Sequence, residues 1–229
     1  MQYPCDTAFY IFIIGKITLL ICHIYDIIKV RTSSDKGGCK LRTVEPIRDQ
    51  RQINAIKRYL KGKNLRDHAL FVAGINVALR ISDLLSLKWG DVLNEKGKFK
   101  TLKLVEQKTK KPRIIRLNKA AQKALQELLD SLDTYSLDDY IFKSREGENR
   151  PITRQQALNI LKDAAETIGV EENVGTHTLR KTWGYHAWKS GYNPALIMET
   201  LNHSNLSVTK RYLGITQSEI NDLYENLNI

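Results

Sequence analysis

Cysteine is scarce in this 229-residue chain and is confined to one end of it. The three cysteines, Cys5, Cys22 and Cys39, lie in the first 39 residues, and none occurs from Lys40 to Ile229. An odd number of cysteines without close pairing predicts neither a disulfide framework nor a cysteine-ligated metal site. Their absence from most of the chain fits a reducing compartment. The length suffices for one sizeable core with a small appendage.

A clean membrane span and a secretion signal are also lacking. Residues 8–30 are strongly apolar and long enough to cross a bilayer, but Lys16, His23 and Asp26 interrupt them. An ionised residue near mid-bilayer costs about 2.5–3.5 kcal/mol, and a basic start and a small-residue cleavage site are missing. We expect a peripheral helix or strand, or an extension of little function, with a membrane tether as the alternative. Residues 31–38 are polar and glycine-bearing, which predicts a linker.

Acidic residues are the minority charge. The chain has 25 Asp and Glu against 36 Lys and Arg, which gives a formal net charge of +11 at pH 7. Such an excess attracts polyanions, and nucleic acid is the commonest polyanion in a cell. A merely basic housekeeping domain is the alternative. The net charge therefore favours nucleic acid as a partner but does not indicate what reaction, if any, the protein catalyses.

Internal repeats and low-complexity tracts are absent, and the sequence after Lys40 shows regular signals of helices. A first helix is expected from the apolar spacing of Ile53, Ile56, Tyr59 and Leu60, and a second over the apolar stretch 68–78. A short third helix is expected with Ser82 as its cap and Asp83 in its first turn. Two later helices are expected after Asn118 and after the capping box Thr153–Gln156, the second of them ending at Gly169. A further helix is expected from Thr176 or Thr178 to Gly191, and another after Asn193 with Pro194 in its first turn. The last is expected over 217–227, after Thr216 with Glu219.

Two short stretches read as strands. Residues 100–105 and 113–117 look like two strands, and a basic turn joins them as in a hairpin. Pro112 directly precedes the second stretch, at a position where a backbone donor is dispensable. The fold class is therefore expected to be mainly α with a small antiparallel β-sheet (α+β).

The first place that could carry chemistry is Arg80. This arginine lies among apolar residues, where an unpaired guanidinium is costly to bury. A structural interpretation is an internal salt bridge to Asp83 or Asp91. The functional interpretation is an anion clamp, because a guanidinium matches a phosphate with two parallel hydrogen bonds.

Two further places follow along the chain. Lys108, Lys110 and Lys111 lie in the turn between the expected strands, either as a solvated tip or as a flexible source of a proton. His177 and Arg180 are three residues apart, so on a helix both address one small group. Convincing metal ligands are missing near them.

The fourth place contains His203 and Tyr212. A lone tyrosine usually belongs to a core, but Tyr212 follows the polar stretch Thr209, Lys210 and Arg211. His186, in contrast, is flanked by aromatic residues and is interpreted as a packing or surface histidine.

Together these places resemble the catalytic domain of the tyrosine recombinases, or phage integrases, over about residues 44–229. The motifs ALRISDLLSLKWGDV, HTLR and LNHSNLSVTKRYLG carry the resemblance, in the family's order of arginine, hairpin lysine, His-x-x-Arg, histidine and tyrosine. Two positions depart from the family pattern: Asn202 stands where glycine is usual, and Lys181 where histidine is frequent. Lys108 matches the hairpin lysine best, with Lys110 and Lys111 as substitutes.

The resemblance implies transesterification on DNA without metal, nucleotide or other cofactor. An enzyme of this kind must supply positive charge to the oxygens of the phosphate in the transition state. By resemblance, Arg80 and Arg180 form the clamp and His203 is a further donor.

The resemblance also assigns the proton transfers and the nucleophile. Tyr212 would attack the phosphate and form a 3′-phosphotyrosyl link. Lys108 would protonate the departing 5′ oxygen, and His177 would exchange a proton with the tyrosine.

The resemblance further implies a domain organisation and partners. Residues 1–39 are expected to be an apolar extension with a linker, and residues 40–229 the catalytic domain. Room for a separate N-terminal DNA-binding domain is lacking, so we expect a minimal recombinase that inverts short segments or moves small elements. A single copy would bind DNA weakly. We expect a tetramer on double-stranded DNA, with accessory DNA-bending or directionality proteins. The enzyme would work in the cytoplasm at the nucleoid rather than at a membrane.

Three points stay open at this stage. The terminal helix, with Ile220, Leu223 and Leu227 at helical spacing, either docks on a neighbouring protomer or packs within its own chain. A type IB topoisomerase shares the chemistry, although the compact size and the spacing from LNHS to Tyr212 favour a recombinase. A DNA-binding regulator that has lost catalysis is the alternative from another functional class.

Overall fold

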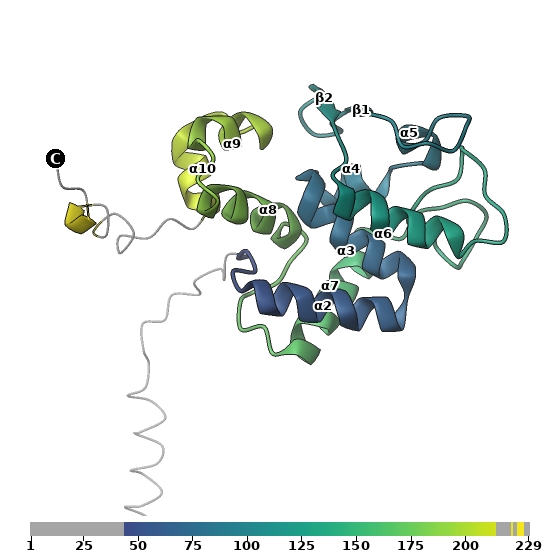
Figure 1. Ribbon diagram of the computed structural model, residues 1–229, viewed down its shortest axis with the longest axis horizontal. Helices are drawn as coiled ribbons and strands as arrows, with labels where there is room; N and C mark the ends of the chain where they lie inside the picture. The colour runs from purple at the N-terminus through teal and green to yellow at the C-terminus, as the bar shows by residue number, and fades with distance from the viewer. Residues whose placement is uncertain (1–43, 214–220, 222–223, 227–229) are drawn as a thin grey trace, which may run out of the picture. The chain divides into compact units, whose positions relative to one another are not determined.

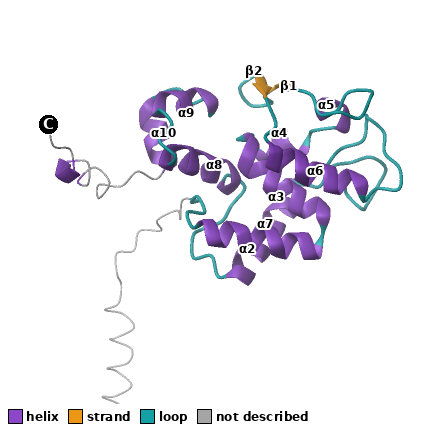
Figure 2. Cartoon of the chain, in the orientation of Figure 1, coloured by secondary structure: helices purple, strands orange, loops and turns teal. Residues whose placement is uncertain are grey.

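The computed structural model describes residues 44–213, 221 and 224–226, and helices dominate this part of the chain (Figure 1, Figure 2). The elements are α2 (Gln50–Lys63), α3 (Leu65–Val77), α4 (Ile81–Leu85), α5 (Trp89–Val92), β1 (Leu102–Val105), β2 (Pro112–Ile115), α6 (Lys119–Asp130), α7 (Arg154–Ile168), α8 (Thr178–Lys189), α9 (Pro194–Thr200) and α10 (Leu206–Leu213). The predicted fold class, mainly helical with one small antiparallel sheet, is confirmed.

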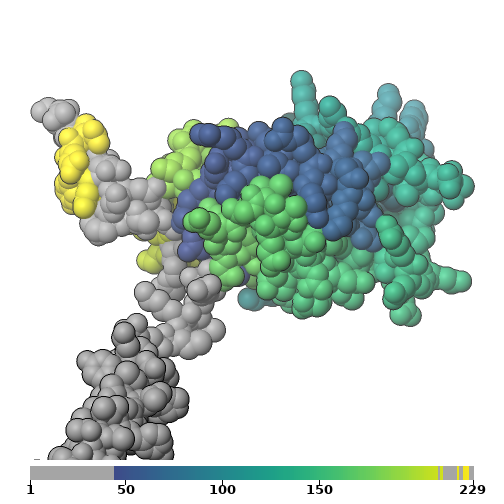
Figure 3. Space-filling view, turned by 90° about the horizontal axis from the view of Figure 1, so that it is seen from below, coloured from purple at the N-terminus to yellow at the C-terminus, as the bar shows by residue number. Residues whose placement is uncertain are grey.

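The amphipathic helices form where their caps and spacing predict. In α2, Ile53, Ile56 and Leu60 are buried, and the side chain of Asp49 accepts a hydrogen bond from the first turn. In α7, Thr153 and Gln156 form the predicted capping box, and Gly169 ends the helix with a φ of 73°. The surfaces of α2 and α7 lie side by side on one face of the molecule (Figure 3).

The two strands form the predicted hairpin. β1 and β2 pair antiparallel, with Leu102 opposite Ile115 and Val105 opposite Pro112. Pro112 thus stands at the end of the ladder, where its missing N–H costs no strand bond. The turn beyond this pair brings Glu106 and Lys108 to the end of the hairpin.

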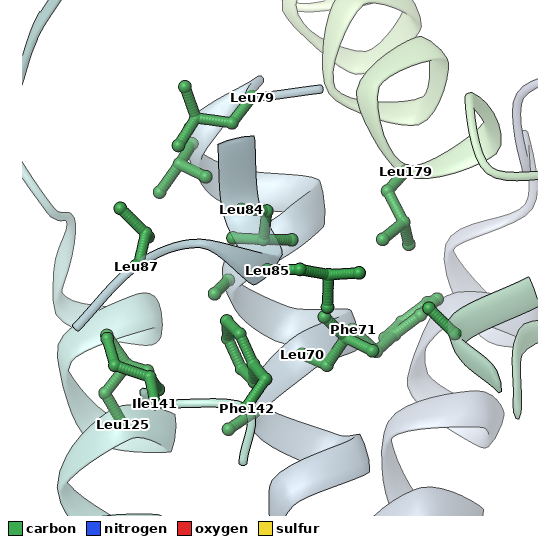
Figure 4. Close-up of a cluster of buried hydrophobic side chains, with 14 of the residues drawn as sticks. Leu70, Phe71, Leu79, Leu84, Leu85, Leu87, Leu125, Ile141, Phe142 and Leu179 are labelled. Atoms are coloured by element: carbon green, nitrogen blue, oxygen red, sulfur yellow. The ribbon is translucent and has the colours of Figure 1, made fainter. Parts of the chain in front are cut away.

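A large apolar core holds the central helices together. Phe71 of α3, Leu84 of α4 and Leu125 of α6 meet Phe142 in it, and all four are almost fully buried (Figure 4). A second, smaller cluster consists of Ala78, Ile197, Leu201 and Leu213, with Tyr212 packed against it. The small cluster joins α8, α9 and α10, so it holds the tyrosine-bearing helix against the rest of the domain.

Glycine allows α8 to approach its neighbours closely. A Cβ atom at Gly74 of α3 would come within 2.4 Å of Leu179 Cδ1, and one at Gly184 would lie 3.0 Å from Leu213 Cδ2. Cβ contacts shorter than about 3 Å force neighbouring atoms to move. Both positions therefore set the placement of α8, which carries Arg180.

One expected helix cap was wrong, one expected helix start was confirmed, and two helices were missed. Ser82 does not cap α4, because Arg80 occupies the N-cap position in an extended conformation. α8 begins at Thr178, one of the two predicted starts, with His177 as its N-cap, and the hydroxyl of Thr178 accepts a hydrogen bond from the Gly175 N–H. The short helix α5 and the helix α10, which carries Tyr212, were not predicted.

Some predictions fall outside the described residues. They are the apolar segment 8–30, the linker 31–38, the division of the chain at residue 39/40, and the capping residues and apolar stripe of the terminal helix. Within the described residues, no helix has the length and apolar character needed to cross a membrane.

Candidate active site

Arg80 leaves the helical path at the junction of α3 and α4. Ala78, with a φ of 54°, ends α3, and Arg80 then takes extended angles before α4 begins. Its Nη1 lies 2.7 Å from a carboxylate oxygen of Glu106. The predicted partners are wrong: Asp83 accepts from the N–H of Gln107, and Asp91 caps α5. The turn frees the Arg80 side chain to cross to the hairpin.

Arg180 is buried on α8 and connects three segments. Its Nη1 donates to the carbonyl of Ala78 at 2.8 Å, and its Nη2 donates to the carbonyl of Leu201. The same Nη1 lies 3.7 Å from Glu106. A guanidinium carries five N–H donors, so Arg180 is fixed by these contacts and still has donors for a substrate.

Glu106 is a residue of the candidate site that sequence reasoning missed. Its fully buried carboxylate pairs with Arg80, with Arg180 and, at 3.1 Å, with Arg113. It also accepts hydrogen bonds from Thr109 at 2.5 Å and from Asn202 at 2.8 Å. Burial opposes its charge, but these hydrogen bonds and the Arg80 guanidinium outweigh burial and lower the pKa of Glu106 to about 2.

A signal for Glu106 was present in the sequence. It is the one acidic residue between Glu95 and Glu127, within a stretch rich in lysine and arginine. A lone carboxylate among so many cations is a natural pairing partner for whichever of them are buried.

Asn202, one of the two departures from the family pattern, has a structural explanation. Its φ of 50° lies in the left-handed region, which asparagine tolerates better than other residues with a side chain. Its amide donates to Glu106 and, at 3.1 Å, to Thr109. Asparagine therefore keeps the turn that glycine would allow and adds a contact to the hairpin.

His203 and Tyr212 face each other. Their ring centroids lie 4.7 Å apart at an interplanar angle of 71°, and His203 Nδ1 lies 3.0 Å from the Thr209 hydroxyl. Burial, assisted by the charges of Arg180 and Arg80, lowers the pKa of His203 to about 4. His203 is therefore neutral at pH 7 in the DNA-free protein.

The hydroxyl of Tyr212 is buried. No hydrogen bond of ordinary geometry reaches it from the described residues, although Arg180 is near enough to act on its charge. Burial raises the pKa of Tyr212 to about 12, against the opposing effect of Arg180 and Arg80. The tyrosine is thus protonated at rest and lies beside the positive charge that a phosphate would share.

Lys181, the second departure, packs on the same tyrosine. Its Nζ lies 5.1 Å from the centroid of the Tyr212 ring and donates to the carbonyl of Val44 at 2.7 Å. A cation over an aromatic face attracts the ring. The lysine therefore supports Tyr212 from the side of α8.

His177 and Lys108 lie at the rim. His177 is exposed at the N-terminus of α8, and partial burial of its ring followed by the charge of Arg180 lowers its pKa. Lys108 is exposed in the turn 107–109, next to Glu106. The structure thus groups Arg80, Arg180, His203 and Tyr212 closely, with His177 and Lys108 on flanking segments.

Two other observations concern His186 and metal binding. His186 lies apart from it and hydrogen-bonds the carbonyl of Ile47 at 3.1 Å, in keeping with the packing role expected of it. Across the described part of the chain, no group of three or more histidine, cysteine or acidic residues is placed to hold a metal ion.

Comparison with known proteins gives consistent matches. The model of the phage integrase family matches residues 48–219. The probable integrase/recombinase YoeC of Bacillus subtilis (strain 168) is 42% identical over 185 residues, which cover 81% of this chain and 97% of YoeC. Tyrosine recombinase XerD of Listeria monocytogenes serotype 4b (strain F2365) is 30% identical over 170 residues, 72% of this chain and 55% of XerD. The chain thus spans nearly all of YoeC and about half of XerD.

Solved structures share the fold. The crystal structure of XerA recombinase matches with a TM-score of 0.64 at 20% identity, over 81% of this chain and 66% of that one. A lambda integrase (75–356) dimer bound to a COC′ core site matches with a TM-score of 0.57 at 14% identity, over 75% of this chain and 60% of that one. At such identities the likeness concerns the fold alone.

Proposed function

Because the chain belongs to the phage integrase family of tyrosine recombinases, we propose that it cuts and rejoins DNA at specific sites through Tyr212. The observation that carries the proposal is the grouping of Arg80, Arg180 and His203 around the buried tyrosine hydroxyl. These groups come from the N-cap of α4, from α8 and from the turn before α10, so the folded domain assembles them from distant parts of the sequence.

The arginines would stabilise the transition state. A phosphodiester resists attack because it is anionic, and charge grows on its non-bridging oxygens as the nucleophile approaches. Arg80 and Arg180 would hold these oxygens through charge-assisted hydrogen bonds. His203 would donate a further hydrogen bond from its ring.

Tyr212 and two rim residues would carry out the bond exchange. The Tyr212 oxygen forms a bond to phosphorus while the bond from phosphorus to the 5′ oxygen breaks. The phenolic proton passes to His177, whose lowered pKa keeps it in the accepting form at pH 7. Lys108 gives a proton to the departing 5′ oxygen, and the reverse sequence rejoins the strand.

The partners would be double-stranded DNA and further copies of this chain. Relatives of similar fold include a lambda integrase dimer bound to a core DNA site. Exchange of two duplexes needs four cleavage sites, so we infer a tetramer on DNA, helped by accessory DNA-bending or directionality proteins. Such an enzyme would act at the nucleoid in the cytoplasm.

A surface cavity offers a place for a neighbouring protomer. The cavity, of about 440 Å³, lies between α2, α3, α8 and α9 and is lined by Trp183, Ala187, Tyr192 and Leu196 among others. Tyr192 and Leu196 are 60% and 53% exposed. The apolar stripe Ile220, Leu223 and Leu227 of another copy would fill it.

The cavity is tested by Leu196→Asp, with the exposed leucine Leu132→Asp as its matched control. We expect Leu196→Asp to bind DNA as a monomer but to lose higher-order complexes in a gel-shift titration, because a carboxylate in an apolar contact is costly. Leu132→Asp should keep them. Loss of higher-order complexes in both variants, or in neither, contradicts the assignment of this cavity.

Strand exchange tests the function itself. Duplexes enriched from a random pool by binding to the protein would be placed in two copies on a supercoiled plasmid. The wild type should give recombinant plasmids, whereas Tyr212→Phe should bind the sites and give none. Relaxation without recombinants at any site would instead favour a topoisomerase, and binding without any product would favour a silent regulator.

A further inference from the structure

Beyond the residues that react, Glu106 gathers the cationic side of the site. We propose that Glu106 is a positioning residue that presets the arginine clamp and links the Lys108 turn to the His203 turn. The inference deepens the proposed recombinase function and rests on it. The contacts of Glu106 carry the argument.

The first step concerns charge. One Glu106 carboxylate contacts Arg80 at 2.7 Å, Arg113 at 3.1 Å and Arg180 at 3.7 Å. Three guanidinium groups held this close repel one another, and a shared carboxylate offsets that repulsion. One negative charge against three positive charges leaves an excess of positive charge for a phosphate.

The second step concerns direction. The Glu106 side chain has no exposed surface, whereas 15% of the Arg80 side chain is exposed. A phosphate that enters from solvent therefore meets the arginine before the carboxylate. Glu106 stands behind the clamp and does not occupy the place of the substrate.

The third step concerns the two turns. Thr109, which follows Lys108, donates to Glu106, and Asn202, which precedes His203, donates to both Glu106 and Thr109. The proton-donating turn and the histidine turn thus share one carboxylate. A shift of either turn would change the other through these short contacts.

The test uses two variants of the full chain on a nicked duplex that traps the covalent intermediate. Glu106→Gln keeps the shape and removes the charge, and Asn202→Gly keeps the left-handed turn and removes the amide. At saturating DNA we expect single-turnover cleavage to fall about 100-fold in Glu106→Gln and about 5-fold in Asn202→Gly, as expected for misplaced catalytic groups. DNA affinity should change by less than about 3-fold, because the phosphate-facing cations remain.

A modified substrate shows which groups Glu106 acts through. Sulfur in place of the bridging 5′ oxygen is a good leaving group and does not need the Lys108 proton. The defect of Glu106→Gln should persist on this substrate, because its main effect passes through the arginines. Recovery to the wild-type rate would overturn the role assigned to the clamp.

Controls separate positioning from folding. Glu127→Gln removes a carboxylate that pairs with Lys61 away from the site and should leave cleavage unchanged. Wild-type cleavage by Glu106→Gln would overturn the inference, as would weaker DNA binding with a normal rate at saturation. If Glu106→Gln does not fold, Asn202→Gly decides by the same rate and affinity criteria.

A measurement without DNA keeps the inference apart from the proposed function. NMR signals of the guanidinium N–H groups of Arg80 and Arg180 should be sharp in the wild type and broadened in Glu106→Gln. A wild type that forms no covalent band would contradict the recombinase proposal, while these signals would still show whether Glu106 fixes the arginines. Identical signals in both proteins would overturn the inference.

Discussion

Two side chains that face each other, His203 and Tyr212, have pKa values moved in opposite directions by burial. The pKa of His203 falls to about 4 and that of Tyr212 rises to about 12. Desolvation disfavours the charged form of each, which is the cation for histidine and the anion for tyrosine. Both groups are therefore neutral at pH 7 before DNA binds, and the permanent charge of the site belongs to the arginines.

The lowered pKa of His203 predicts a loss of stability in mild acid. The unfolded chain binds the histidine proton near pH 6.5 and the folded chain only near pH 4, so stability present above pH 6.5 is lost as the pH falls toward 4. Between pH 7 and pH 4.5 this amounts to about 2 kcal/mol. In urea titrations at the two pH values, the free energy of unfolding of His203→Gln should fall by about 2 kcal/mol less than that of the wild type. An equal loss in both proteins would contradict the shift.

Lys108 should be needed only to protonate the leaving group. Lys108→Ala is expected to slow cleavage of an ordinary duplex by about 10²- to 10⁴-fold, the usual contribution of a general acid. A duplex with a 5′ bridging sulfur should restore most of the rate, since sulfur leaves without a proton. Lys110→Ala and Lys111→Ala serve as matched controls in the same turn. A larger loss in either of them would move the role to that lysine.

For single residues of the candidate site, the sequence predicted the reactive side chains but not the side chains that pair with them. The order and spacing of the motifs were enough to nominate Arg80, Arg180, His203 and Tyr212. The partner of Arg80 was not predictable from local spacing, because Glu106 lies on the hairpin and reaches it only in the folded domain. Nearby Asp83 was a reasonable choice, but its carboxylate is used by the N–H of Gln107.

Among the elements, α8 determines how the site is assembled. It carries Arg180 and Lys181, and it contacts α3, α9 and α10. Figure 1 shows α9 and α10 grouped on α8, which places the histidine turn and the tyrosine helix beside one arginine. A displacement of α8 should therefore affect several of the proposed catalytic groups together.

Gly74→Ala tests this packing. The added Cβ would lie 2.4 Å from Leu179 Cδ1, so α3 and α8 must separate or Leu179 must leave its place. We expect a loss of about 1–3 kcal/mol in the free energy of unfolding together with slower cleavage. Gly62→Ala in α2 is the matched control, because nothing lies within 4 Å of the added atom. It should be neutral or stabilising by up to about 1 kcal/mol, and equal effects of the two substitutions would contradict the account.

Most helices were predictable from their caps or apolar spacing, whereas α5 and α10 were missed. α6 and α7 begin at the predicted caps, and α6 buries the predicted apolar residues, as α2 does for Ile53, Ile56 and Leu60. α10 was missed because it is only eight residues long, and its cluster with Ala78, Ile197 and Leu201 forms only in the folded chain. α5 is a single turn held by neighbouring segments, which local periodicity does not reveal.

Over the whole chain, the formal charge of +11 predicts a strongly salt-dependent affinity for DNA. Contacts to about six phosphates would weaken binding on the order of 10³-fold between 50 and 200 mM salt. Through the contacts of this domain, a monomer should bind a single site no more tightly than about micromolar at physiological salt. A gel-shift titration across this salt range measures both quantities. Nanomolar binding by the monomer at physiological salt would contradict the expectation.

The central claim, that Tyr212 is the nucleophile of a DNA strand-exchange enzyme, is tested most directly by covalent trapping. The wild type and Tyr212→Phe would be incubated with nicked duplexes carrying sites enriched by binding, and then denatured. We predict a denaturation-resistant protein–DNA band for the wild type that disappears in Tyr212→Phe, although the variant still binds the DNA. A band that persists in Tyr212→Phe, or binding by the wild type with no band on any such duplex, would contradict the claim.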